Sequence, residues 1–257
     1  NYALIEINHT RSNMKGHLLD LVSHTHELGC IDLIKITGNE TTTKIEGLAE
    51  DRSIVLKAQF SNPVNEFNGT FGLPNLNNLK TLLNISEYKD DAIISVKRQD
   101  RNEEKNVPVG LHFTNKNNDF KNDYRFMVSE VVNDKLKVVD FKGTNWDVEF
   151  TPSDNNIGRF KMQAQINPDE VLFHVKTEDG NLMFYFGDPS THAGNFVFQG
   201  DVTGNINGVW NYPIRQVIGI LSLVGDKTMK ISDKGAMEIV IDSGIASYNY
   251  ILPAQSK

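Results

Sequence analysis

Hydrophobic and polar positions change their spacing along the first half of the chain, and each change predicts an element. The stretch 11–28 opens near a candidate N-cap, Ser12, and repeats apolar residues at helical spacing, which predicts a helix. Apolar residues then alternate through "CIDLIKITGNETTTKIEGLAED", with turn residues at Gly38 and Asn39, as in a β-hairpin. A third strand ("SIVLKAQF"), a second helix ("LNNLKTLLN") and a closing strand ("DYRFMV") are predicted after it.

The same succession is predicted again in the second half of the chain. A helix over 153–165 has Ser153 as its N-cap, and the hairpin that follows turns at Asp179 and Gly180. The segment "NFVFQGDV" predicts a third strand, "YPIRQVIGILSLV" a second helix and "SYNYILP" a last strand. The two halves therefore contain the same elements in the same order.

Two pairs of leucines give the spacing between the halves. Leu33 matches Leu172 at an offset of 172 − 33 = 139, and Leu83 matches Leu221 at an offset of 221 − 83 = 138. Solenoid repeats are about 20–50 residues long, so a period of this length indicates a duplicated domain. We predict an α+β fold with dominant sheets, made of one domain at 1–135 and a second at 136–257. The polar stretch 131–147 is predicted to connect them as a strand or a long linker.

The charge is distributed unevenly between the predicted helices and the remainder of the chain. A net charge of −7 argues against a protein that grips nucleic acid, which is typically basic. The four predicted helices nevertheless hold six bases and three acids, which leaves 26 − 6 = 20 bases and 33 − 3 = 30 acids elsewhere. Small-number variation on solvated helix faces is the alternative explanation. The six bases are Arg11, Lys15, Lys80, Arg159, Lys161 and Arg215.

The order of elements, with an L-x-x-L-L-x-I helix in the first copy, resembles the DNA polymerase sliding clamps, especially those of bacteriophages and of the PCNA type. The segments "LNNLKTLLNISEYKDDAIIS", "YPIRQVIGILSLVGDKTMKIS" and "SYNYILPAQSK" carry the resemblance, which covers most of the chain through pattern and scattered residues. It implies a duplicated two-domain clamp fold, with helices lining a central channel and antiparallel sheets outside. A ring of three subunits would contain six such domains.

The resemblance also implies a function that needs neither catalysis nor a cofactor. A clamp encircles double-stranded DNA, serves a polymerase and a clamp loader, and would lie in the cytoplasm, or in the host cytoplasm if it is viral. Enclosure retains the DNA, so the channel needs only mobile, non-specific phosphate contacts. We expect these from Lys15, Lys80, Arg159 and Arg215, and secondarily from Arg11 and Lys161; a solvated surface base is the alternative for each.

Clamps further bind short peptide tails of their partners in an apolar pocket between the connector and the C-terminal segment. The resemblance assigns this pocket to Val138, Val139, Ile251, Leu252 and Pro253, with ordinary strand core as the alternative. Subunits would join through edge strands, which the sequence does not identify. The polar stretch 97–123 is expected to be an extended hairpin loop that a minimal clamp does not need.

Other chemistry has less support in the sequence. The one cysteine, Cys30, excludes an intrachain disulfide and fits a reducing cytoplasm, and no apolar run approaches the ~20 residues of a membrane span. His24 and His26 diverge on a helix, which is poor geometry for a shared metal. Nothing resembles a nucleophile elbow or a phosphate-binding loop. A ring-forming virion or tail protein is the alternative function, and an enzyme whose carboxylates meet only on folding is a third class.

Overall fold

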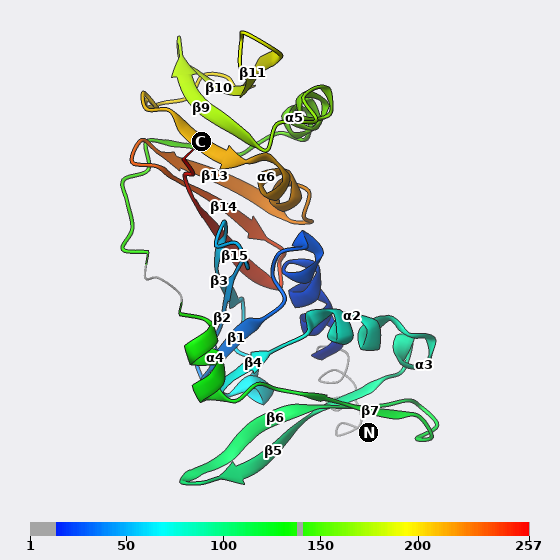
Figure 1. Cartoon of the computed structure of the whole chain (residues 1–257). Helices are drawn as coiled ribbons and strands as arrows, with labels where there is room; N and C mark the ends of the chain where they lie inside the picture. The colour runs from blue at the N-terminus through cyan, green and yellow to red at the C-terminus, as the bar shows by residue number, and fades with distance from the viewer. Residues whose placement is uncertain (1–13, 138–140, 257) are drawn as a thin grey trace. The chain divides into compact units, whose positions relative to one another are not determined.

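The computed structural model describes residues 14–137 and 141–256 (Figure 1). The chain divides into two compact units, the first made of residues 1–50, 57–138 and 244–247. The second unit is made of residues 51–56, 139–243 and 248–257. Each unit combines helices with antiparallel sheets, which confirms the predicted α+β class.

The first unit opens with a helix over residues 14–23. Its strands run in the order β4-β1-β2-β3, and β5, β6 and β7 form a separate three-stranded sheet. Two helices, α2 and α3, connect these groups, and a further helix, α4, follows β7. The bounds are η1 (His26–Leu28), β1 (Ile34–Gly38), β2 (Thr43–Leu48), β3 (Val55–Phe60), η2 (Asn65–Phe67), β4 (Gly69–Leu73), α2 (Leu76–Asn84), α3 (Ser86–Lys89), β5 (Ile93–Arg101), β6 (Glu104–Thr114), β7 (Lys121–Arg125) and α4 (Ser129–Lys135).

The second unit contains two helices, α5 and α6, and two groups of strands. The strand orders are β11-β10-β9-β12 and β15-β14-β13-β8. The bounds are β8 (Val148–Phe150), α5 (Asp154–Ile166), β9 (Leu172–Glu178), β10 (Asn181–Gly187), β11 (Ala193–Gln199), β12 (Trp210–Pro213), α6 (Ile214–Leu221), β13 (Asp226–Ser232), β14 (Ala236–Asp242) and β15 (Ala246–Pro253).

The two units repeat one arrangement, which confirms the predicted duplication. The order β4-β1-β2-β3 has its counterpart in β12-β9-β10-β11, and the strand registers agree as well. Ile36 lies opposite Ile45 in the first hairpin, and Val175 lies opposite Phe184 in the second, so both offsets are 175 − 36 = 184 − 45 = 139. The sequence did not predict β4 and β12, the short strands that directly precede α2 and α6.

One inserted residue explains why the two offsets differ. Pro74 and Pro213 still match at 213 − 74 = 139, whereas the helices begin at Leu76 and Ile214, an offset of 214 − 76 = 138. The extra residue is Asn75, whose φ of 49° and ψ of 57° are left-handed. Asparagine tolerates this region better than most residues, so the first unit accommodates the insertion in a single backbone position.

The repeated helices bury the same face. Leu76, Leu79 and Leu83 of α2 lie in the core, and Ile214, Val217 and Leu221 occupy the matching positions of α6. The helix α5 is fixed by Phe160, whose ring centroid lies 4.8 Å from that of Phe173 and 5.1 Å from that of Phe184. Apolar burial of this kind therefore sets which side of each helix remains available.

Two expectations were wrong in part, although the described residues 141–147 of the connector form neither helix nor strand, as the linker alternative predicts. The connector begins as the helix α4 rather than as a strand, because Val132 and Leu136 are buried four residues apart and pack as one helical face. Gly72 permits this packing, since a Cβ there would lie 2.9 Å from Cγ2 of Val132. No strand occurs in residues 141–147.

The polar stretch 97–123 is also not a loop. The strands β5 and β6 form a long hairpin and β7 pairs with β6, so most of the stretch is ordered sheet (Figure 1). Its polar residues occupy exposed positions of these strands, which explains the low hydrophobicity of the sequence there.

Candidate nucleic-acid interface

The helices of the second unit lie side by side. Ser153 caps α5 as predicted, since its Oγ accepts a hydrogen bond from the backbone N–H of Asn156 at 3.1 Å. The helix α5 packs against both α6 and β11 (Figure 1). The predicted bases of this unit are therefore carried by two neighbouring helices.

Arg159 and Lys161 of α5 have different surroundings. The guanidinium of Arg159 lies 5.4 Å from the ring centroid of Phe196 and donates from Nη1 to the carbonyl oxygen of Val197 at 3.3 Å. Lys161 is exposed and forms no hydrogen bond or ion pair with any described residue. Residues two apart on a helix point in different directions, so these two bases cannot contact one phosphate group together.

Arg215 lies in the first turn of α6. Its side chain is exposed, while its neighbours Ile214 and Val217 face the core. Within the described parts of the chain it has no acidic partner. A free guanidinium on a helix without acidic residues is suited to non-specific phosphate contact.

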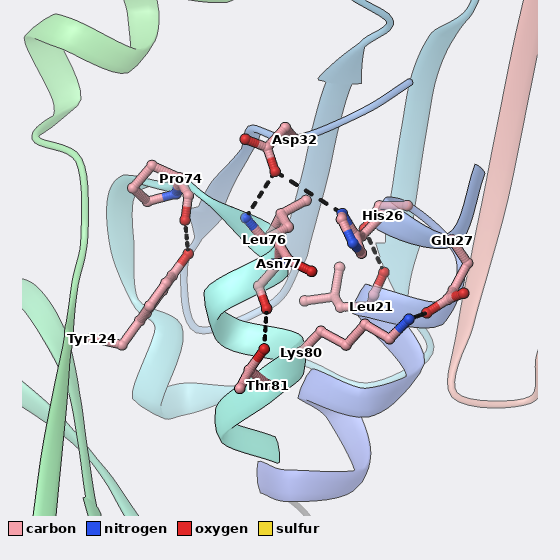
Figure 2. Close-up of polar contacts among 11 residues, drawn as sticks. Leu21, His26, Glu27, Asp32, Pro74, Leu76, Asn77, Lys80, Thr81 and Tyr124 are labelled. Atoms are coloured by element: carbon pink, nitrogen blue, oxygen red, sulfur yellow. Dashed lines mark hydrogen bonds and ion pairs between the residues drawn. The ribbon is translucent and has the colours of Figure 1, made fainter. Parts of the chain in front are cut away.

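The start of α2 is held by residues from three other segments (Figure 2). Its N-cap position, Asn75, makes no side-chain cap, and the carboxylate of Asp32 accepts instead from the backbone N–H of Leu76 at 3.1 Å. His26 Nδ1 lies 4.0 Å from the same carboxylate. The hydroxyl of Tyr124 donates to the carbonyl oxygen of Pro74, and burial, with the nearby charge of Asp32, raises the pKa of Tyr124. These contacts fix the direction in which α2 leaves β4.

Lys80 projects from α2 toward the turn η1, where it meets an acid (Figure 2). Its Nζ lies 2.5 Å from Oε1 of Glu27, and the two side chains are 41% and 43% exposed. A partly exposed pair adds little stability, but it offsets the positive charge that a phosphate would meet. The sequence could not reveal this pairing, because 53 residues separate the partners (80 − 27).

Lys15 is also engaged within the first unit. Its ammonium donates to the carbonyl oxygens of Tyr88 at 2.5 Å and Lys89 at 2.7 Å, at the C-terminal end of α3. Burial lowers the pKa of Lys15, and the negative charge of Asp90 acts in the opposite direction. This lysine therefore stabilises a helix end as well as carrying charge.

The remaining predicted residues are placed as follows. Arg11, Val138 and Val139 lie outside the described residues, as does the candidate cap Ser12. Ile251 and Leu252 are buried in β15, whereas Pro253 is exposed.

Two further observations concern other kinds of site. Among the described residues, no three or more His, Cys, Asp and Glu side chains gather where they could hold a metal. None of the described helices is long and apolar enough to cross a membrane.

Comparison with known proteins finds no match in sequence but finds similar structures. No family model matches the chain, and no curated protein matches it in sequence. It is similar in structure to A. fulgidus PCNA, solved with the C-terminal region of FEN-1 bound, with a TM-score of 0.67 at 8% identity, over 93% of this chain and 96% of that one. The fold is PCNA-like. A second solved structure, the proliferating cellular nuclear antigen of Entamoeba histolytica, has a TM-score of 0.66 at 11% identity over the same shares.

The four described helices that carry the predicted bases are counterparts of one another in the two units. The helix over 14–23 and α2 in the first unit are the counterparts of α5 and α6 in the second. All of the predicted DNA contacts that the structure describes lie on these four helices. The pattern of the sequence was therefore sufficient to find the elements that carry the bases.

Proposed function

We propose that this protein is a DNA sliding clamp, a ring that encircles duplex DNA and tethers a replicative polymerase. The observation that carries the proposal is the duplicated α+β unit, whose arrangement matches PCNA over 93% of the chain at a TM-score of 0.67. The ring is a homo-oligomer of three subunits, by the resemblance of the sequence to the clamps. It acts as a scaffold without enzymatic activity, in the cytoplasm or in that of a host cell if the protein belongs to a bacteriophage.

The charge distribution supports a protein that encloses DNA rather than one that binds DNA tightly. A chain of net charge −7 would bind DNA poorly at its outer surface, so the bases of the four helices are the groups available for phosphates. Arg215 and Lys161 are the strongest candidates, because each is exposed and without a partner in the described chain. Lys80, Lys15 and Arg159 would need to exchange an existing contact.

Partner proteins would bind through short peptide tails, as the FEN-1 C-terminal region does with A. fulgidus PCNA. We propose that the site lies at the connector and the C-terminal segment, with Val138, Val139, Ile251, Leu252 and Pro253. Of the three that the structure describes, Pro253 is exposed and could meet a peptide directly. Leu252 is fully buried, so it would support the site from beneath. The partners are a polymerase and a clamp loader.

A topological assay tests the proposal directly. The protein is loaded on nicked circular DNA by a clamp loader, and the DNA is then linearised with a restriction enzyme. A ring stays on the circle and slides off the linear form, so retention should fall on cutting. A primer-extension assay on primed circular DNA should show longer products when the protein is present. Equal retention on both forms, together with unchanged product length, would contradict the proposal.

A further inference from the structure

The sheet of β5, β6 and β7 has an outer face on which bases outnumber acids (Figure 1). Leu111 and Tyr124 lie opposite each other and are buried on the inner face. Their neighbours along the strands point the other way, because side chains alternate between the two faces of a sheet. Where all three strands pair, the titratable residues of the outer face are Lys97, His112, Lys121, Asp123 and Arg125.

Three of these residues contact one another. Oδ1 of Asp123 lies 2.8 Å from Nζ of Lys97 and 2.8 Å from Nδ1 of His112. These two hydrogen bonds lower the pKa of Asp123, so its carboxylate is ionised at neutral pH. The side chain of Asp123 is still 62% exposed, which leaves it accessible to a further partner.

Lys121 and Arg125 lie on either side of Asp123 along β7. Both are exposed, and neither forms a hydrogen bond or an ion pair with any described residue. Each is two positions from Asp123, so the three side chains point the same way and form a row of charges in the order positive, negative, positive. Four residues of a strand span about 13 Å, which separates the two bases along this row.

The corresponding face of the second unit has a different charge pattern. The strands β13, β14 and β15 follow α6 as β5, β6 and β7 follow α2. Lys230 of β13 lies opposite Glu149 of β8 and Glu238 of β14, and its Nζ lies 3.6 Å from Oε1 of Glu238. This base is therefore flanked by two acids, whereas Lys121 and Arg125 have no acidic partner in the described chain.

The row of charges on β7 ends beside a cavity of the same unit. Arg125 lines this cavity, which has a volume of about 450 Å³, together with Val107 and Val109 of β6. Glu104 and Glu130 also line it. The cavity therefore suits an apolar group and opposes a further negative charge.

We propose that this face binds an extended segment of a partner protein, with acids at positions i and i+4, a base at i+2 and an apolar residue at i+6. An extended segment that lies along β7 directs alternate side chains toward it at the spacing of the row. The two acids of the segment meet Lys121 and Arg125, and its base meets Asp123. The apolar residue enters the cavity beside Arg125.

The acid in the middle of the row favours a peptide over a nucleic acid. A nucleic-acid strand carries only negative charges along its backbone, and Asp123 would repel a phosphate that lay between Lys121 and Arg125. The outer face also contains no Phe, Tyr or Trp over the paired residues of the three strands, so it offers no such ring for a base to stack on. A segment of alternating charge is therefore the better match.

This inference goes beyond the proposed clamp and does not depend on it. Every residue involved belongs to the first unit, and none lies on the helices that are proposed to contact DNA. A partner bound here would leave those helices uncovered.

Two synthetic peptides test the charge pattern. The labelled peptide GESKSESLG has the proposed order of charges, and GKSESKSLG has the inverted order. Fluorescence anisotropy at low salt should show that the full chain binds the first peptide at least about fivefold more tightly, although the net charge of −7 favours the second. Equal binding, or tighter binding of the inverted peptide, would overturn the proposal.

Charge reversal on β7 locates the site. Lys121→Glu with Arg125→Glu should weaken binding of GESKSESLG by about fivefold or more, because both acids of the peptide then meet acids. Lys161→Glu with Arg215→Glu makes the same change of net charge at exposed positions of α5 and α6, and should bind the peptide like wild type. Equal losses in the two double variants would overturn the assignment to this face.

A triple variant guards against a loss that comes from misfolding. Lys121→Glu, Asp123→Lys and Arg125→Glu together invert the row, so this protein should bind GKSESKSLG more tightly than GESKSESLG. A variant that keeps the circular dichroism of wild type but does not reverse the preference would overturn the proposal. Replacing the leucine of GESKSESLG by serine should weaken binding by about two- to threefold, and an unchanged affinity would show that the cavity is not used.

Two further outcomes separate the possible explanations. If an oligonucleotide of thymidine binds to the face and the peptide does not, the face is a nucleic-acid surface and the proposal is wrong. Lys121→Glu with Arg125→Glu should leave retention on circular DNA unchanged. A chain that binds the peptide as described but is not retained on circular DNA would contradict the clamp function and support this inference alone.

Discussion

The two units share one arrangement of elements but differ in what their bases contact. In the first unit, Lys15 binds two carbonyl oxygens and Lys80 pairs with Glu27. In the second, Lys161 and Arg215 are exposed and have no partner among the described residues. Duplication has therefore preserved the helices while their charges acquired different roles. Among the described residues, the exposed bases without a partner on these helices therefore lie in the second unit, although the sequence places three of the six bases in each unit.

The units also differ in how their repeated helices begin. Asp32 caps α2 from a distant segment and Asn75 is inserted before it, whereas α6 starts directly from Pro213. Proline needs no hydrogen-bond partner for its nitrogen and has a fixed φ, which suits a helix start. Both units also hold the first N–H of the helix with a distant backbone carbonyl, Asp32 for Leu76 at 3.4 Å and Val171 for Ile214 at 3.0 Å. The first unit differs in adding the carboxylate of Asp32.

The largest expected effect concerns the aromatic core, which is concentrated around Phe160 in the second unit. Phe160→Ala should lower the free energy of unfolding by about 3–5 kcal/mol, because it removes a fully buried ring and leaves a cavity. Urea unfolding followed by tryptophan fluorescence measures this, since Trp146 and Trp210 both belong to that unit. Met162→Ala, at an exposed position of the same helix, is the control. A loss below about 1 kcal/mol for Phe160→Ala would contradict this account of the core.

The difference in available charge is tested by neutralising one base in each repeated helix. Arg215→Gln should reduce the salt dependence of duplex binding by about one ion, whereas Lys80→Gln should change it by less than half as much. The reason is that Glu27 already offsets the charge of Lys80. Fluorescence anisotropy with a labelled duplex across a salt series provides the measurement. Equal effects of the two variants would show that the ion pair does not persist when DNA is bound.

Removal of the distant cap on α2 should lower the free energy of unfolding less than removal of the Phe160 side chain. Asp32→Ala removes the carboxylate that accepts from the N–H of Leu76 at 3.1 Å and leaves only the longer contact, 3.4 Å, with the backbone carbonyl of residue 32. The loss should cost about 1 kcal/mol, as for other helix caps. Asp32→Asn keeps an acceptor oxygen and should recover part of the loss. Ser153→Ala provides the matched change in the second unit, where the cap is local. Urea unfolding followed by circular dichroism compares the three; no change with Asp32→Ala would mean that Asn75 or water can cap the helix.

The smallest expected effect is a change in Trp210 fluorescence at low pH, when Asp233 is protonated. Burial acts to raise the pKa of Asp233, but hydrogen bonds from the N–H groups of Gly208, Trp210 and Asn207 outweigh it and lower the pKa. A lowered carboxyl pKa contributes stability above the unfolded-state pKa, and this contribution is lost as the pH falls through the folded-state value. Trp210 fluorescence should therefore change on the acid side of pH ~4. Asp233→Asn should remove that change, and an unaltered titration would assign it to another group.

The sequence predicted the elements better than their contacts. Alternation located the hairpins, and their registers agree at one offset because inward residues such as Ile36 and Val175 must face the core. Periodicity found α2 and α6 because each buries three matched positions. These signals are local, so a single sequence is sufficient to show them.

The features that the sequence did not show depend on tertiary neighbours. The helix α4 covers the start of the connector, where a strand or a long linker was predicted, because Val132 packs where Gly72 leaves space. The partners of Lys15 and Lys80 are 53 to 74 residues away, and the Val197 carbonyl is 38 residues from Arg159, so spacing along the chain carries no signal for these contacts. The peptide pocket stays a prediction. The position of β11 at the edge of its sheet follows only from the strand order of the folded protein.

Asn75 identifies the point at which this fold tolerates a change of length. The extra residue falls between β4 and α2, so the two-residue alternation of the strand and the turn of the helix both keep their phase. An addition inside either element would instead rotate its apolar side away from the interior. A single added residue is accordingly accommodated after Pro74 with less disturbance than inside β4 or α2.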